Sequence, residues 1–119
     1  MVKLAIVGLG QRGMDLLTQT ILKMDDCMVV AVCDEYEDRA EAAKKAVFEA
    51  KGEEPFCTTN YKEAVTREDV QGVIVSTAWE AHVDVAVCAM EAGKYVGIEV
   101  GGAYSVEDCW ELVRVSEKT

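Results

Sequence analysis

The residues with the clearest chemical meaning form a glycine-rich segment near the start of the chain. Gly8, Gly10 and Gly13 match the pattern G-x-G-x-x-G. The variable positions of this pattern are Leu9, Gln11 and Arg12. After a strand and before a helix, the pattern is typical of dinucleotide binding: the first glycine makes a tight turn, the second admits a pyrophosphate, and the third lets helix and strand pack closely. Backbone N–H groups at the helix start would bind the phosphates, and Arg12 either adds a charge contact or is solvated.

A carboxylate stands where such a site needs one. Asp34 ends the second apolar run, 21 positions after Gly13, and the expected distance is about 20 residues. It would accept hydrogen bonds from the adenosine ribose, and Glu35 adds a second negative charge. Because both would repel a 2′-phosphate, we predict NAD rather than NADP as the cofactor. The alternative for Asp34 is a helix-capping role, and Arg39 is interpreted as a surface residue of the next helix.

Alternating strands and helices must position these residues. Short apolar runs predict five strands, at residues 3–7, 28–33, 56–57, 73–77 and 95–100. Apolar stripes with helical spacing lie at Met14, Leu17, Ile21 and Met24, at Ala40, Ala43, Val47 and Ala50, at Val83, Ala86, Val87 and Met90, and at Val106, Cys109, Trp110 and Val113. This order predicts an α/β fold, a Rossmann-type doubly wound parallel sheet in three layers (α/β/α), with residues 1–119 forming a single domain.

Several residues are expected to begin or end these helices. Asn60 and Glu63 predict a reciprocal cap for a short helix around residues 61–65. Gly52, together with Pro55, is expected to end the second long helix, and Gly93 stands where a left-handed residue would end the third. Ser105 would cap the last one.

Ligands of such sheets bind beyond the carboxyl ends of the strands, which adds candidates after the fourth and fifth strands. The expected crevice is bordered on one side by the residues after the fourth strand, Ser76, Thr77, Ala78 and Trp79, and on the other side by Glu99 and Val100. Trp79 either stacks on a ring or covers the helix end, and Glu99 either binds cofactor hydroxyls or caps the loop. His82 is the single histidine, for which a structural role is the alternative.

Composition excludes several classes of function. The chain of 119 residues has a formal net charge of −10, which argues against a nucleic-acid partner, and it holds no apolar run of the length a membrane span needs. Its five cysteines show no C-x-x-C spacing, so neither a disulfide framework nor a metal site is expected. Reduced, buried cysteines favour a cytoplasmic location.

The chain resembles the cofactor-binding half of the Gfo/Idh/MocA (glucose–fructose oxidoreductase / inositol dehydrogenase) family. The resemblance rests on the glycine segment, on Asp34, on residues 76–82, and on residues 89–94 running into Glu99. It implies NAD as cofactor, a sugar- or polyol-like CH–OH substrate, a nicotinamide-facing role for Thr77 and His82, and a cofactor contact for Glu99. Ala78 replaces the family's proline.

Val100 stands where the family usually has a lysine that serves substrate binding or catalysis. One branch of the family, the NAD-dependent glycoside hydrolases, has Glu-Val at this point and is also similar around residues 77–82, 89–91 and 109–113. That similarity implies that tightly held NAD transiently oxidises a sugar hydroxyl, the aglycone is eliminated, water adds, and the hydride returns. Gly101 departs from the proline usual in that branch.

Three functions stay open. The chain is the NAD-binding domain of a sugar oxidoreductase, the same domain of an NAD-dependent glycoside hydrolase, or a stand-alone NAD-sensing module. We identify no catalytic residue in it, so we expect it to bind NAD without turnover by itself. A doubly wound sheet normally adds a sixth strand, so we expect the chain to be truncated at Thr119. The family resemblance implies that a substrate domain would follow. The oligomeric state stays open, a homo-oligomer included.

Overall fold

Strands and helices alternate along the chain, as predicted. The structure is a computed structural model that describes residues 2–77, 79–98 and 106–119. Its strands are β1 (Val2–Val7), β2 (Cys27–Cys33), β3 (Phe56–Thr58), β4 (Gly72–Val75) and β5 (Tyr95–Ile98). Its helices are α1 (Gln11–Gln19), the 3-10 turn η1 (Ile21–Lys23), α2 (Glu37–Lys51), α3 (Tyr61–Val65), α4 (Trp79–Glu91) and α5 (Val106–Lys118). Within those described ranges, no helix has the length and apolarity needed to cross a membrane.

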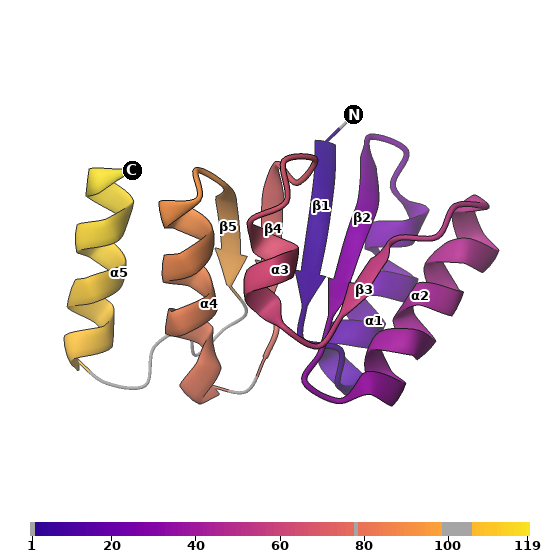
Figure 1. The fold of residues 1–119 in the computed structure, drawn as a ribbon, viewed down its shortest axis with the longest axis horizontal. Coiled ribbons are helices and arrows are strands. Elements are labelled where there is room, and N and C mark those ends of the chain that lie inside the picture. The colour runs from indigo at the N-terminus through magenta and orange to yellow at the C-terminus, as the bar shows by residue number, and fades with distance from the viewer. Residues whose placement is uncertain (1, 78, 99–105) are drawn as a thin grey trace.

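The described strands form one parallel sheet in the order β3-β2-β1-β4-β5 (Figure 1). The chain starts at the centre with β1, builds outward to β3, and then crosses back to place β4 on the other side of β1. This reversal confirms the predicted doubly wound sheet. In such sheets the crevice for a ligand opens at the carboxyl ends of the strands beside the reversal.

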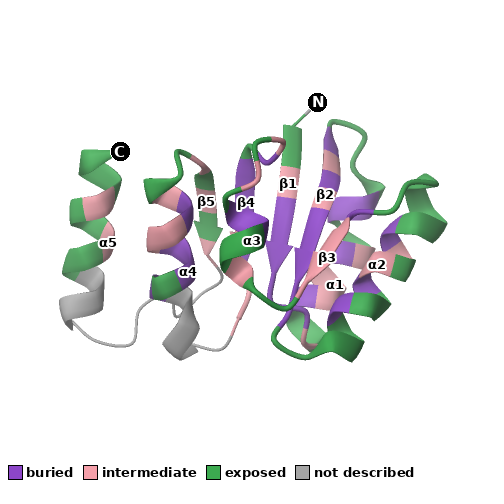
Figure 2. Ribbon diagram, in the orientation of Figure 1, coloured by how far each residue is buried: buried purple, intermediate pink, exposed green. Residues whose placement is uncertain are grey.

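Helices cover both faces of this sheet. Successive side chains of a strand point to opposite faces. Accordingly, Ile6 of β1 packs with residues of α1 and α2, whereas Ala5 and Val7 pack with residues of α3 and α4. Figure 2 shows the buried central strands β1, β2 and β4 between these helices. The three-layer α/β/α architecture is therefore confirmed.

Two predicted helix ends are confirmed. Gly52 and Gly93 have φ values of 80° and 81°, in the left-handed region that glycine adopts without strain. At Gly93 the N–H groups of Gly93 and Lys94 donate to the carbonyls of Met90 and Ala89, which is a Schellman motif.

The predicted cap of α3 is correct in one half only. Asn60 Oδ1 accepts the Lys62 N–H at 3.0 Å, as expected. The Asn60 N–H, however, donates to the Thr58 hydroxyl and not to Glu63. The Thr58 hydroxyl in turn donates to the Glu63 carboxylate, so Thr58 at the end of β3 stands between the two groups.

The first helix is shorter than its apolar stripe predicts. α1 ends at Gln19, and Ile21 is buried in the 3-10 turn that follows. Met24 lies beyond that turn and is 42% exposed. Over three residues the periods of an α-turn and a 3-10 turn are too similar for the stripe to separate them.

The predicted stripe of α4 is confirmed at Val83 and Ala86, which are buried, but the buried face is wider than predicted. Val85 and Ala89 are buried as well, because the helix packs between α3 and α5 as well as on the sheet.

The predicted stripe of α5 is partly wrong. In α5, the predicted stripe residues Trp110 and Val113 are 61% and 47% exposed. α5 packs beside α4 at the end of the molecule (Figure 1), with Leu112 half-buried instead.

Candidate functional site

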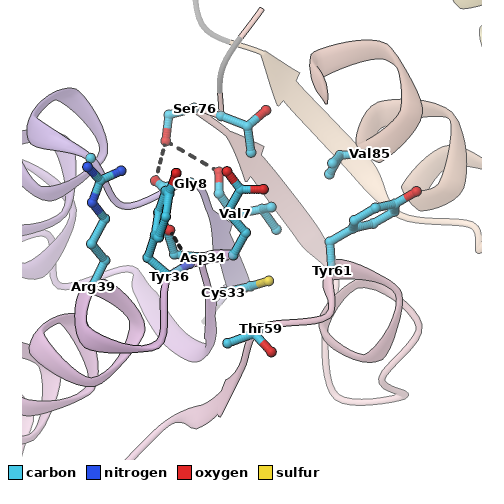
Figure 3. A pocket seen from close by; sticks show the side chains of 13 residues that line it. Val7, Gly8, Cys33, Asp34, Tyr36, Arg39, Thr59, Tyr61, Ser76 and Val85 are labelled. Atoms are coloured by element: carbon cyan, nitrogen blue, oxygen red, sulfur yellow. Dashed lines mark hydrogen bonds between the residues drawn. The ribbon is translucent and has the colours of Figure 1, made fainter. Parts of the chain in front are cut away.

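A pocket of about 600 Å³ lies at the carboxyl ends of β1, β2 and β4, where the doubly wound topology predicts the ligand. The predicted residues that line it are Gly8, Gly10, Asp34, Glu35, Ser76 and Thr77. Figure 3 shows that its two walls come from different layers, with Tyr36 and Arg39 on one side and Tyr61 and Val85 on the other.

Two glycines of the loop after β1 are required by the protein itself. Gly8 has a φ of 97°, and a Cβ there would lie 2.5 Å from the backbone of Ser76 and Thr77. A Cβ on Gly13 would lie 2.0 Å from the Gly8 carbonyl oxygen. The tight turn and the close packing of helix and strand therefore leave no room for a side chain at either position.

Gly10 is different, because nothing in the described protein requires glycine there. Its φ is −68°, which any residue adopts, and a Cβ would meet no described atom nearer than the Arg39 guanidinium at 3.6 Å. Gly10 thus keeps open a space that faces the pocket. An entering pyrophosphate needs that space, so the loop fits a dinucleotide.

The first turn of α1 is suited to anions. Gly10 is its N-cap, and among the described residues no side chain caps the helix and no acidic residue lies in its first turn. The first intrahelical bond is donated by Met14 N–H to the Gly10 carbonyl, and the first turn of a helix is where backbone N–H groups can bind phosphate oxygens. Gln11 and Arg12 are exposed on this turn.

Asp34 is buried, with 7% exposure, and its carboxylate is held by the backbone. Oδ2 accepts the Leu9 N–H at 2.7 Å, and Oδ1 accepts the Tyr36 N–H at 2.9 Å. The second bond makes an Asx turn ahead of α2, but it is not the helix cap of the alternative interpretation, because Tyr36 is the N-cap and no described side chain caps α2. A carboxylate has about four acceptor positions, and the remaining ones can take ribose hydroxyls.

Arg39 is exposed, but it also lines the pocket, which the sequence interpretation did not foresee. Its guanidinium carbon lies 4.7 Å from the centre of the Tyr36 ring, a stacked cation–π geometry. The spacing of three residues at the start of α2 puts both side chains on one side of the helix. With the expected position of the ligand known, that spacing would have identified both residues.

The opposite wall was also missed. Thr59 and Tyr61 follow β3, and Cys33 ends β2 at the base of the pocket (Figure 3). Burial, reinforced by the negative charge of Asp34, raises the pKa of Cys33 to about 12, so its thiol is protonated and unreactive. Burial also raises the pKa of Tyr61. The rule that ligands bind at strand ends applies to β3 as well and would have indicated Thr59.

The other predicted residues divide into three groups. Leu9 meets Asp34 through its backbone, whereas its side chain is 1% exposed and packs under α1 and α2. Trp79 and His82 lie in the first turn of α4. The remaining predicted positions, which lie outside the described residues, are Ala78, Glu99 and Val100.

Comparisons with known proteins agree with this architecture. The profile of the family GFO_IDH_MocA, described as "Oxidoreductase family, NAD-binding Rossmann fold", matches residues 2–119. An alpha-N-acetylgalactosaminidase of Bacteroides fragilis is 39% identical over 100% of this chain and 28% of its own length. The enzyme of the same name from Shewanella oneidensis is 31% identical over 99% of this chain and 26% of its own length. The chain thus spans little more than a quarter of these relatives.

Solved structures show the same fold. The apo scyllo-inositol dehydrogenase of Lactobacillus casei superposes with a TM-score of 0.87 at 23% identity, covering 99% of this chain and 33% of that one. A 3-ketoreductase from Actinomadura kijaniata, solved with TDP-benzene and NADP, gives a TM-score of 0.84 at 18% identity over 98% of this chain and 35% of that one. Since the family profile covers nearly all of its residues, the chain belongs to the Gfo/Idh/MocA oxidoreductase family and is an NAD-binding Rossmann domain.

Proposed function

We propose that this chain is the cofactor-binding domain of an NAD-dependent glycoside hydrolase acting on α-linked N-acetylgalactosamine. The observation that carries the proposal is the similarity of the whole chain to relatives named alpha-N-acetylgalactosaminidase, at 31% and 39% identity. Val100 supports it, because a valine in place of the lysine usual in the family cannot transfer a proton.

The pocket would hold the adenosine half of NAD. The Asp34 and Glu35 carboxylates would face the ribose hydroxyls, and the N–H groups at the start of α1 would face the pyrophosphate. Arg39, stacked on Tyr36, offers a flat cationic surface on which the adenine ring can lie. Two carboxylates at the ribose end outweigh one guanidinium, so we expect NAD to bind more tightly than NADP.

When bound, NAD would supply the transient oxidation of a sugar hydroxyl. The contribution of this chain is to bind and orient the cofactor. The groups that move protons on the sugar would belong to a substrate domain outside these residues. After the aglycone is eliminated and water adds in its place, return of the hydride to the sugar carbonyl would restore the hydroxyl and the starting oxidation state of the cofactor.

The test uses the protein that carries this chain, with 4-nitrophenyl α-N-acetylgalactosaminide as the probe. We expect release of nitrophenol without accumulation of NADH at 340 nm. In D₂O, the product sugar should gain deuterium at a carbon next to the oxidised one, because that C–H bond breaks and re-forms. Ordinary hydrolysis would add no such deuterium.

A net sugar oxidoreductase is the second candidate, favoured by the description of the family as oxidoreductases. It would accumulate NADH with free N-acetylgalactosamine or a polyol and would leave the nitrophenyl glycoside intact. That result would overturn the glycosidase proposal while keeping NAD binding.

A further inference from the structure

We propose that Ser76 and Asp34 form a clamp on the Gly8–Leu9 peptide group, and that Ser76 is a positioning residue for pyrophosphate binding. The inference rests on NAD occupying the pocket described above. Ser76, the residue after β4, would thus act on the pyrophosphate indirectly, by holding the glycine loop in place.

The two side chains hold opposite ends of one peptide unit. Asp34 Oδ2 accepts the Leu9 N–H at 2.7 Å, and the Ser76 hydroxyl donates to the Gly8 carbonyl at 2.8 Å. In a planar trans peptide these two groups point in opposite directions. The contact of Asp34 comes from the end of β2, and that of Ser76, drawn in Figure 3, comes from the end of β4, so the peptide plane is fixed from both sides.

Ser76 is itself well fixed. Its backbone N–H donates to the Val7 carbonyl at 2.8 Å, which continues the ladder between β4 and β1. Its hydroxyl oxygen also lies 3.4 Å from the Val7 carbonyl. A hydroxyl has a single proton, and the 2.8 Å distance makes Gly8 the main acceptor.

The loop needs such a clamp because glycine rotates freely. Gly8 already has a φ of 97°, and glycine adopts positive and negative φ with similar ease. A rotated peptide would turn the Gly8 carbonyl away from Ser76 and toward Asp34. The same carbonyl lies directly against the Cα of Gly13, so its position also sets where the first turn of α1 begins. The clamp thereby pre-orients the N–H groups that face the pyrophosphate.

Removing the Ser76 hydroxyl should weaken the binding of ligands with a pyrophosphate selectively. Without the Ser76 hydroxyl, the affinity for ligands with a pyrophosphate should fall about three- to tenfold, the effect of one neutral hydrogen bond. The affinity for adenosine should stay within about twofold, because the adenosine end is held by the residues after β2. A general loss of folding would lower both affinities together.

The experiment compares ADP-ribose and adenosine in NMR titrations of the 119-residue chain. The variants are Ser76→Ala, Ser76→Thr and Thr18→Ala. Ser76→Thr keeps the hydroxyl and should restore the binding of ADP-ribose. Thr18→Ala is the matched control, since its hydroxyl also donates to a backbone carbonyl, that of Met14 at 2.8 Å, away from the loop. It should change neither affinity.

The outcomes are distinct. Weaker binding of ADP-ribose alone in Ser76→Ala, restored in Ser76→Thr, supports the clamp. Equal binding of ADP-ribose by Ser76→Ala and wild type, or an equal loss for both ligands, overturns it while the NAD site stands. Failure of the wild-type chain to bind ADP-ribose or NAD would overturn the site and the clamp together.

Discussion

Replacing Gly10 with alanine should leave the fold intact and weaken NAD binding. The new Cβ would meet no described atom nearer than Arg39 at 3.6 Å, and the φ of −68° suits alanine. Alanine is a poorer N-cap than glycine, which lowers the free energy of unfolding by about 0.5–1 kcal/mol. Alanine also restricts the unfolded chain, which raises the free energy of unfolding by about 0.4–1 kcal/mol. The free energy of unfolding should therefore stay within about 1 kcal/mol of the wild-type value.

The binding of NAD should respond much more strongly. The methyl group would occupy the space through which the pyrophosphate approaches the backbone, and overpacking of this kind costs about 1–3 kcal/mol. That range corresponds to a Kd about 5- to 150-fold higher. Isothermal titration with NAD measures it directly.

Gly13→Ala is the matched variant, with the opposite expectation for stability. Its Cβ would lie 2.0 Å from the Gly8 carbonyl oxygen and 3.0 Å from the Ser76 hydroxyl, so the loop must shift. We expect urea denaturation to show a loss of about 2 kcal/mol or more. Unchanged NAD affinity in Gly10→Ala would refute the proposed path of the pyrophosphate. Equal stability of the two alanine variants would refute the packing argument.

Three further predictions concern the walls and the base of the pocket. Asp34→Ala should weaken NAD binding about tenfold and narrow the preference over NADP, because a negative charge and a ribose acceptor are lost; an unchanged preference in titrations would place the ribose elsewhere. Arg39→Ala should weaken adenosine binding about threefold, because the surface on which the adenine ring would lie is lost. Arg67→Ala is the control, because it removes a similar stack on Phe56 outside this pocket and should leave adenosine binding unchanged. Equal effects of the two variants in the same titration would contradict adenine binding on Arg39. The pKa of Cys33 is raised from 9.0 to about 12, so the folded chain holds the thiol proton at pH values where the unfolded chain has lost it. The stability that this proton contributes is therefore complete below pH 9 and is lost as the pH rises toward 12. Urea denaturation between these pH values should show a steeper decline for wild type than for the Cys33→Ala variant, and parallel declines would count against the shift.

The sequence was sufficient for the first strand–helix–strand unit because several local signals agree there. The glycine spacing, the apolar run before it and the carboxylate at Asp34 all describe one arrangement, and the structure brings Gly8, Gly10 and Asp34 to one pocket. Turn residues were predictable for the same reason, since Gly52 and Gly93 adopt a backbone conformation that other residues rarely adopt.

Features that depend on neighbouring elements were not predictable from local patterns. The spacing of Tyr36 and Arg39 predicts that they share one side of α2, but the position of Arg39 beside the glycine loop depends on how α2 packs against the sheet. The apolar stripe of α5 predicted a buried face, but Trp110 is exposed because the helix lies beside α4 at the end of the sheet. Likewise, Thr58 displaced Glu63 from the predicted cap because strand and helix meet there in space.

The double attachment of Asp34 limits how cofactor preference can be redesigned or can evolve at this site. The carboxylate that would exclude a 2′-phosphate also accepts the N–H groups of Leu9 and Tyr36. A replacement chosen to admit the phosphate therefore disturbs two backbone contacts at once, because asparagine keeps one of the two oxygen acceptors and alanine keeps neither. An adaptive path to NADP has to remove the charge while keeping an acceptor for Leu9.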